Sequence, residues 1–118
     1  SEDLELLARV IHGEARGESY LGKLAVGAVV VNRLNSPLFP DTLYEVIYEP
    51  WAFTCVQDGQ INLEPDEESY RAAMDALNGI DPTNGCLFYY NPKTATSRWM
   101  FKRPTDYTET IGNHVFMK

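Results

Sequence analysis

Apolar residues in the first part of the chain recur with helical spacing. Residues 4–14 place them three and four positions apart, on one face of a helix, and residues 20–35 place them on nearly every face. The second pattern is typical of a helix that is buried on all sides. Prolines follow it, and a short third helix capped by Asp41 or Thr42 is expected before Pro50.

The remainder of the pattern predicts one more helix and then strands. After Pro65, Glu67–Leu77 has the spacing of an amphipathic fourth helix. Its apolar face is formed by Tyr70, Ala73, Met74 and Leu77. Residues 86–90 form an apolar and aromatic run that predicts a strand, and two further short strands are expected near 107–110 and 114–117. Because helices come first and strands later, we expect an α+β fold with a helical majority.

Length and charge narrow the class of protein. With 118 residues the chain has the size of one domain, and residues 59–65 are expected to be a loop rather than a domain boundary. The net charge of −7, without clustered basic residues, disfavours a nucleic-acid partner. The longest apolar run, residues 24–31, is shorter than the roughly 20 residues of a bilayer-spanning helix. Because residues 1–3 include neither Met nor a basic segment, we expect any export signal or anchoring region to lie upstream.

Cysteine and histidine positions exclude several chemistries. Cys55 and Cys86 lie in no metal or redox motif, which leaves two alternatives open: one disulfide closing a loop of about 30 residues, or two free thiols in the core. His12 and His114 have no third ligand at metal spacing, so we expect structural roles for them and neither a metal nor a cofactor. The sequence contains no serine or cysteine nucleophile signature and no glycine-rich phosphate loop.

Glu14 is the carboxylate with the most unusual position. It lies four residues after Val10 and seven after Leu7, so it shares a helix face with apolar side chains. A carboxyl group half-buried among apolar side chains can hold a proton and donate it to a glycosidic oxygen. Spacing alone does not separate this role from that of a solvated surface residue. Glu18 is the obvious second carboxylate and Asp58 a weaker third.

Aromatic residues provide a second signal, because sugar rings stack on their faces. They are Trp51, Phe53, Tyr89, Tyr90, Trp99 and Phe101. We expect most of them to be core residues, since a small domain needs large side chains to fill its interior. Tyr89 and Tyr90 are consecutive on a strand and point to opposite faces, so at most one of them is expected to face a given cleft.

Four segments, in order along the chain, resemble the catalytic domain of the spore cortex-lytic enzyme family. They are residues 8–18 (ARVIHGEARGE), 25–33 (AVGAVVVNR), 51–61 (WAFTCVQDGQI) and 88–97 (FYYNPKTATS). The resemblance implies one catalytic domain over residues 1–118, with a lysozyme-like fold made of a helical lobe and a small β portion. It matches Glu14 to the family's catalytic glutamate and Glu18 to a second acidic residue of the same motif.

The resemblance also implies a substrate and a mechanism. It places Phe53, Thr54, Tyr89, Tyr90 and Asn91 near the substrate groove. The family members are lytic transglycosylases that act on spore cortex peptidoglycan during germination, and one acid/base suffices for the 1,6-anhydromuramic product. The alternatives are a hydrolytic muramidase with a second carboxylate and a non-catalytic glycan-binding module.

Further expectations about location and partners follow from the same resemblance. It implies an exported protein of the spore cortex or cell wall, outside the inner membrane. It also implies a monomer that binds the glycan strands, and it leaves room for a partner protein at the spore membrane.

Overall fold

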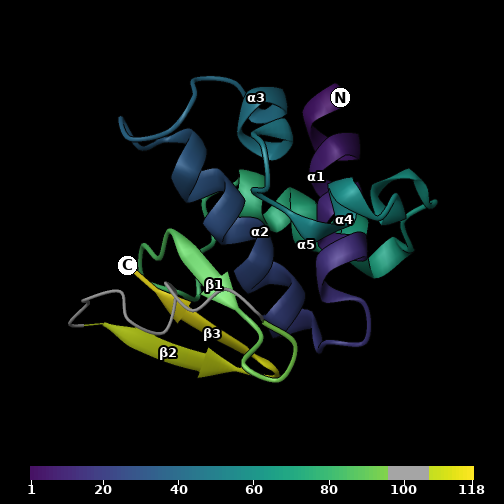
Figure 1. The fold of residues 1–118 in the computed structure, drawn as a ribbon. Helices are drawn as coiled ribbons and strands as arrows, with labels where there is room; N and C mark the ends of the chain where they lie inside the picture. The colour runs from purple at the N-terminus through teal and green to yellow at the C-terminus, as the bar shows by residue number, and fades with distance from the viewer. Residues whose placement is uncertain (96–106) are drawn as a thin grey trace.

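The computed structural model describes residues 1–95 and 107–118, and Trp99 and Phe101 lie outside these ranges. Within them, a group of helices packs against a small antiparallel sheet, which lies below the helices in Figure 1. The predicted α+β class with a helical majority is confirmed. No helix of the described ranges is long and apolar enough to cross a membrane.

All four predicted helices are present, and two further short ones accompany them. The elements are α1 (Glu2–Ala15), α2 (Tyr20–Leu34), α3 (Leu43–Tyr48), α4 (Thr54–Gln57), the 3₁₀ helix η1 (Gln60–Asn62) and α5 (Glu67–Leu77). The 3₁₀ helix η1 falls in residues 59–65, for which the sequence predicts a loop, and α4 falls in a segment for which no helix is predicted. Each is about one turn long, too short for a hydrophobic period to develop.

Side-chain caps set where the helices begin. The Ser1 side chain accepts a hydrogen bond from the N–H of Leu4, so α1 starts before the predicted position. Thr42, one of the two predicted alternatives, caps α3. Ser19 caps α2 and Asp66 caps α5 in the same way.

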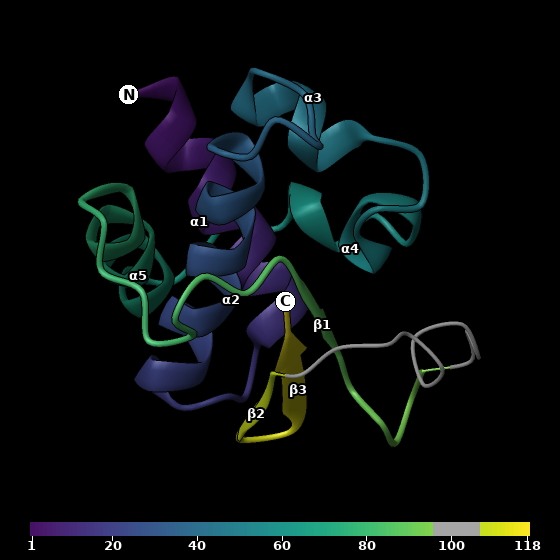
Figure 2. The same ribbon diagram turned by 90° about the vertical axis from the view of Figure 1, so that its left-hand side faces the viewer.

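The α2 helix is central because it packs against helices on one side and the sheet on the other. It contacts α1 and α5, and Figure 2 shows α2 between α5 and the α3–α4 side, above the sheet. A second core cluster joins α2 to the sheet. It consists of Ala15, Ala25, Val26, Val29, Cys86, Ile111 and Phe116. This double packing explains why α2 is apolar on nearly every face, as predicted.

The α5 helix has the predicted bounds, and its predicted apolar face is correct except at Met74, because Tyr70, Ala73 and Leu77 pack in the core cluster of the helices. Its buried residues are Ser69, Ala72, Ala73 and Ala76, whereas the Met74 side chain is 52% exposed. Small side chains face α1 and α2 because they let the three helix axes approach closely. The prediction for Met74 was therefore wrong, and that for Ala73 was right.

The sheet has three antiparallel strands in the order β1–β3–β2. They are β1 (Phe88–Tyr90), β2 (Thr108–Ile111) and β3 (His114–Met117), close to the predicted positions. Tyr89 of β1 is opposite Phe116 of β3, and Ile111 of β2 is opposite His114. Since β3 pairs on both sides, it determines where the other two strands lie.

Both cysteines are free thiols in the structure, which decides between the two alternatives left open by the sequence. Cys55 is buried in the core cluster of the helices, and Cys86 is buried in the cluster between α2 and the sheet. The Cys86 Sγ is 3.2 Å from the carbonyl oxygen of Thr83. The two thiols therefore fill different parts of the core.

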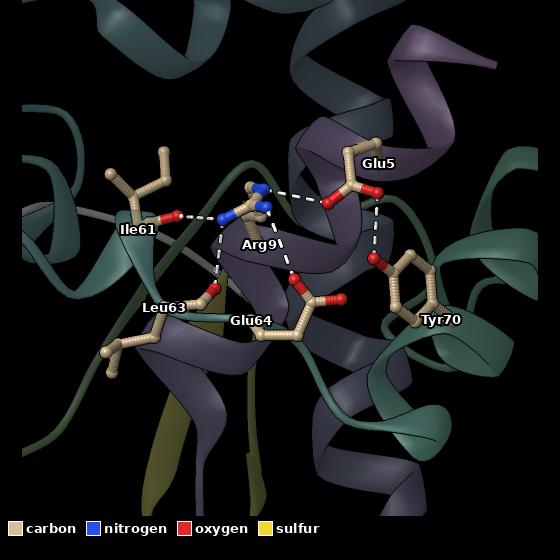
Figure 3. A network of polar contacts seen from close by, with 6 residues as sticks. All are labelled: Glu5, Arg9, Ile61, Leu63, Glu64 and Tyr70. Atoms are coloured by element: carbon tan, nitrogen blue, oxygen red, sulfur yellow. Dashed lines mark hydrogen bonds and ion pairs between the residues drawn. The ribbon is translucent and has the colours of Figure 1, made fainter.

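Arg9 attaches the segment after α4 to α1 (Figure 3). Its guanidinium donates to the carbonyl oxygens of Ile61 and Leu63 at 3.4 and 3.1 Å, and to Glu5 at 2.8 Å. Glu5 in turn accepts a hydrogen bond from the Tyr70 hydroxyl of α5 at 2.7 Å. One network thus connects α1 to both η1 and α5, on elements that also position the functional site.

Arg9→Ala is expected to lower the free energy of unfolding by about 1–2 kcal/mol, because two carbonyl acceptors lose a charged donor that is only partly solvated. Arg9→Lys keeps the charge but not the forked geometry, so it should recover only part of the loss. Urea unfolding followed by circular dichroism measures both. Equal stability of Arg9→Ala and the parent would contradict the proposed attachment.

Candidate active site

A cavity of about 760 Å³ lies where the helices meet the sheet. Its lining includes one polar or aromatic side chain from each of five elements. These are Glu14 of α1, Arg33 of α2, Thr54 of α4, Tyr89 of β1 and His114 of β3. The cavity therefore exists only when both parts of the fold are assembled.

The Glu14 carboxyl is held between α4 and β1. Its Oε2 accepts a hydrogen bond from the backbone N–H of Cys55 at 2.9 Å, and its Oε1 accepts one from the Tyr89 hydroxyl at 2.5 Å. Glu14 is half-buried and belongs to the cavity lining. A carboxyl group with both oxygens oriented in this way is positioned to exchange a proton with a bound molecule.

Gly13 allows α4 to come close enough for the Cys55 contact. A Cβ atom at position 13 would lie 2.6 Å from the Cys55 Cβ, a distance that side chains do not tolerate. Any larger residue would push α4 away and remove its N–H from Glu14. The glycine that precedes Glu14 is therefore part of the site, although the sequence analysis assigned it no role.

Tyr89 is locked by aromatic contacts with three residues. Its ring centroid lies 5.2 Å from His114 in an edge-on contact, 5.8 Å from Phe116 and 6.5 Å from Phe53. Burial, together with the adjacent Glu14 carboxylate, raises the pKa of Tyr89 well above its ordinary value of 10.0. The phenol therefore stays protonated and can donate to Glu14.

Burial also decides the charge state of two other groups in the lining. It raises the pKa of the Cys55 thiol well above 9.0, with the Glu14 carboxylate adding to the effect, so Cys55 is a poor nucleophile. Burial lowers the pKa of His114 below 6.5, although Glu18 and Glu14 act in the opposite direction. The imidazole is therefore neutral at pH 7.

Arg33 is a buried cation that the sequence analysis did not single out. It is 8% exposed, and its Nε donates to the carbonyl oxygen of Leu87 at 2.7 Å. Its guanidinium carbon lies 5.1–5.4 Å from the ring centroids of Phe39, Phe53 and Phe88. Burial lowers its pKa, while Tyr89, Glu49 and Glu14 oppose that change. An arginine at the end of an otherwise apolar helix was the signal available in the sequence.

The predicted groove residues divide into two groups. Thr54, Tyr89, Tyr90 and Asn91 lie in the cavity lining with Glu14. Phe53 is not part of the lining and is 2% exposed, so it supports Arg33 and Tyr89 from the core. The expectation that only one of the two tyrosines faces the cleft was wrong. Because β1 is a three-residue edge strand, the cavity borders its end and not only one of its faces.

Glu18 lies outside the cavity lining and holds the turn between β2 and β3. Its Oε1 accepts from the backbone N–H of Asn113 at 3.1 Å, and its Oε2 accepts from the Asn113 side chain at 2.8 Å. A Cβ at Gly112 would collide with Glu18 Oε1, so a larger residue there would displace the carboxylate from its present position. The turn held by Glu18 leads directly into His114 and β3.

Two other carboxylates, Asp58 and Glu49, do line the cavity. Both oxygens of Asp58 accept hydrogen bonds from Gln60, at 3.0 Å from its N–H and 2.8 Å from its side chain. These bonds lower the pKa of Asp58 below 3.8, which makes it a weak base. His12 is not in the lining, and its Nδ1 lies 3.9 Å from Asp66. The described ranges contain no group of His, Cys, Asp and Glu suited to a metal ion.

An oriented carboxyl group in an aromatic-lined cavity between helices and a sheet suits an acid/base enzyme that acts on glycans. The chain belongs to the cell wall hydrolase family, whose model matches residues 17–117.

Relatives and solved structures agree with this assignment. A spore cortex-lytic enzyme of Halalkalibacterium halodurans is 55% identical over 97% of this chain, which spans 34% of that protein. The crystal structure of the catalytic domain of the Bacillus cereus SleB protein matches with 51% identity and a TM-score of 0.89, covering 100% of this chain and 91% of the other. The catalytic domain of the germination-specific lytic transglycosylase SleB from Bacillus anthracis matches with 50% identity and a TM-score of 0.91, covering 100% and 95%.

The Glu18 contact predicts a pH-dependent contribution to stability. Partial burial acts to raise the pKa of Glu18, but the Asn113 donors and His114 outweigh it, so the pKa lies below its ordinary value of 4.5. The stabilisation is therefore complete above pH 4.5 and is lost as the pH falls through the folded-state pKa.

Glu18→Gln should be less stable than the parent at pH 6, by about 1 kcal/mol, and the difference should shrink below pH 4.5. Urea unfolding at a series of pH values measures the difference, and Glu2→Gln on the exposed start of α1 is the matched control. A stability difference that is independent of pH would contradict this role.

Proposed function

We propose that this chain is a lytic transglycosylase domain that cleaves spore cortex peptidoglycan between N-acetylmuramic acid and N-acetylglucosamine, leaving 1,6-anhydromuramic ends. The observation that carries the proposal is the Glu14 carboxyl, oriented in the cavity by Cys55 and Tyr89. The similarity to the Bacillus anthracis domain, which comes from a germination-specific lytic transglycosylase, supports it. Action during germination, at the spore cortex or cell wall after export, belongs to the same proposal.

In the first step, protonated Glu14 donates its proton to the oxygen that bridges the two sugars. The bond from that oxygen to C1 of the muramic acid breaks, and the ring develops oxocarbenium character. The Tyr89 hydroxyl can both donate and accept a hydrogen bond, so its contact with Glu14 is compatible with either protonation state.

In the second step, the Glu14 carboxylate removes the proton from the C6 hydroxyl of the muramic acid. The hydroxyl oxygen bonds to C1, which closes the 1,6-anhydro ring and returns the proton to Glu14 without consuming water. The backbone N–H of Cys55 can only donate, so its hydrogen bond holds the Glu14 oxygen in place as an acceptor during this step. One residue thus serves both half-reactions.

The positions of the other carboxylates favour the route with one glutamate. Glu18 is engaged by Asn113 outside the lining, and Asp58 is made a weak base by its bonds to Gln60. Because Asp58 and Glu49 do line the cavity, a hydrolytic muramidase with one of them as second carboxylate is the remaining alternative. Thr54, Tyr90 and Asn91 are the proposed substrate-binding residues.

Glu14→Gln should reduce the release of muropeptides from purified cortex about 10²- to 10⁴-fold, because the amide cannot transfer a proton at neutral pH. The variant preserves the size of the side chain, so its melting temperature should remain close to that of the parent. Glu2→Gln, on the exposed start of the same helix, is the control. Parental activity of Glu14→Gln would favour a glycan-binding module or a different catalytic residue.

The mass of the products distinguishes the two glycan-cleaving mechanisms. Transglycosylation yields muropeptides that are one water lighter than those of hydrolysis, because the C6 hydroxyl replaces the attacking water. Mass spectrometry of products from the parent protein should show the anhydro form. Reducing-end muramic acid as the sole product would establish the muramidase alternative.

Tyr89→Phe should lower kcat about 10- to 100-fold with little change in KM, because the ring packing remains while Glu14 loses one of its two orienting donors. Steady-state kinetics on solubilised glycan strands measures both constants. Tyr44→Phe, on the exposed face of α3, is a control that should behave as the parent. A variant with the parental kcat would remove Tyr89 from the mechanism.

A further inference from the structure

Trp51 occupies a backbone conformation that tryptophan rarely adopts. Its φ is +64°, in the left-handed region, and the only other non-glycine residue with positive φ in residues 1–95 and 107–118 is Asn84. Asparagine tolerates that region because its short polar side chain bonds locally, whereas a bulky aromatic residue there is strained. Such strain is found at functional sites more often than elsewhere.

The strain arises from a turn that normally carries glycine at this position. The N–H of Ala52 donates to the carbonyl oxygen of Glu49 at 3.0 Å, which closes a four-residue turn with Pro50 and Trp51 at its centre. Proline at the second position and positive φ at the third define a type II turn, in which the third residue is usually glycine or asparagine. In this chain Trp51 takes that position with a strained backbone, where glycine would fit without strain.

Packing in the core does not compensate for that strain. The Trp51 side chain is 84% exposed, the largest fraction among the exposed large hydrophobic residues of the described ranges, although tryptophan is among the more buried residue types. Phe53, two positions later, is 2% exposed and fills the core, as the sequence analysis expects of most of the aromatic residues. A side chain that stabilises neither its turn nor the core is expected to act on something outside the fold.

Trp51 lies on the rim of the cavity that contains Glu14. It lines the cavity together with Glu49, Pro50 and Ala52 of the same turn, beside the α4 residues Thr54 and Cys55. An indole presents a broad apolar face with an N–H donor at its edge. The C–H face of a pyranose ring is complementary to such a surface, and its hydroxyl groups are complementary to the N–H.

We propose that Trp51 is a sugar-stacking residue that binds a pyranose ring of the glycan strand at the rim of the catalytic cavity. The proposal rests on the proposed function, because it takes peptidoglycan glycan as the ligand. The type II turn presents the indole to the cavity, and the strain of the turn is the cost of that placement.

The test combines binding and stability, because this role predicts opposite effects on the two. Trp51→Gly removes the indole and relieves the positive φ, so the dissociation constant for glycan strands should rise roughly tenfold. Its melting temperature should stay the same or rise by up to about 4 °C. Trp51→Phe keeps a stacking face and should bind within about threefold of the parent. Leu38→Ala, at an exposed residue outside the lining, is the matched control.

Binding is measured in the full chain carrying Glu14→Gln, with glycan strands solubilised from purified cortex, so that cleavage does not alter the ligand. Unchanged affinity of Trp51→Gly overturns the proposal, and so does a loss that Trp51→Phe does not recover. This outcome is separate from that of the proposed function. An active Glu14→Gln variant or a hydrolytic product would contradict the proposed mechanism. Loss of binding in Trp51→Gly would still show that Trp51 contacts the sugar.

Discussion

The hydrogen bonds of the Glu14 carboxyl are the contacts on which the whole site depends. One oxygen is bound to the first turn of α4 and the other to β1, at residues 41 and 75 positions further along the chain. The contact to α4 requires a residue without a side chain at Gly13, and the contact to β1 requires the packing of Tyr89 on Phe116. A carboxyl group oriented from two parts of the fold can transfer a proton without first reorganising its surroundings.

The same short segment of sequence contains the proposed catalytic residue and a contact that holds the fold together. Gly13 and Glu14 form the base of the cavity, while Glu18 binds the turn between β2 and β3 through Asn113. That turn leads into β3, which pairs with β1 and so determines the position of Tyr89. The two glutamates therefore contribute to one site in different ways, Glu14 as the proposed acid/base and Glu18 through the sheet.

Buried charge and backbone strain are both concentrated around this cavity. Arg33 lines the cavity and is held among three phenylalanine rings, and Trp51 occupies a position suited to glycine at the rim. Neither arrangement is the most stable choice for its position, since a buried cation and a strained turn both cost free energy. Most of the remaining core is apolar, and its burial offsets the free energy that these two features cost.

By itself, the sequence determined the helical majority, the all-round burial of α2, the bounds of α5 and the three strands, because hydrophobic period and proline position are local properties. Through family resemblance it also predicted a place in or near the site for Glu14, Thr54, Tyr89, Tyr90 and Asn91. Only the tertiary structure decided that Glu18 holds a turn, that both cysteines are free, and that Arg33, His114 and Trp51 line the cavity. These roles depend on contacts between distant segments, and local periodicity carries no information about which distant residues meet.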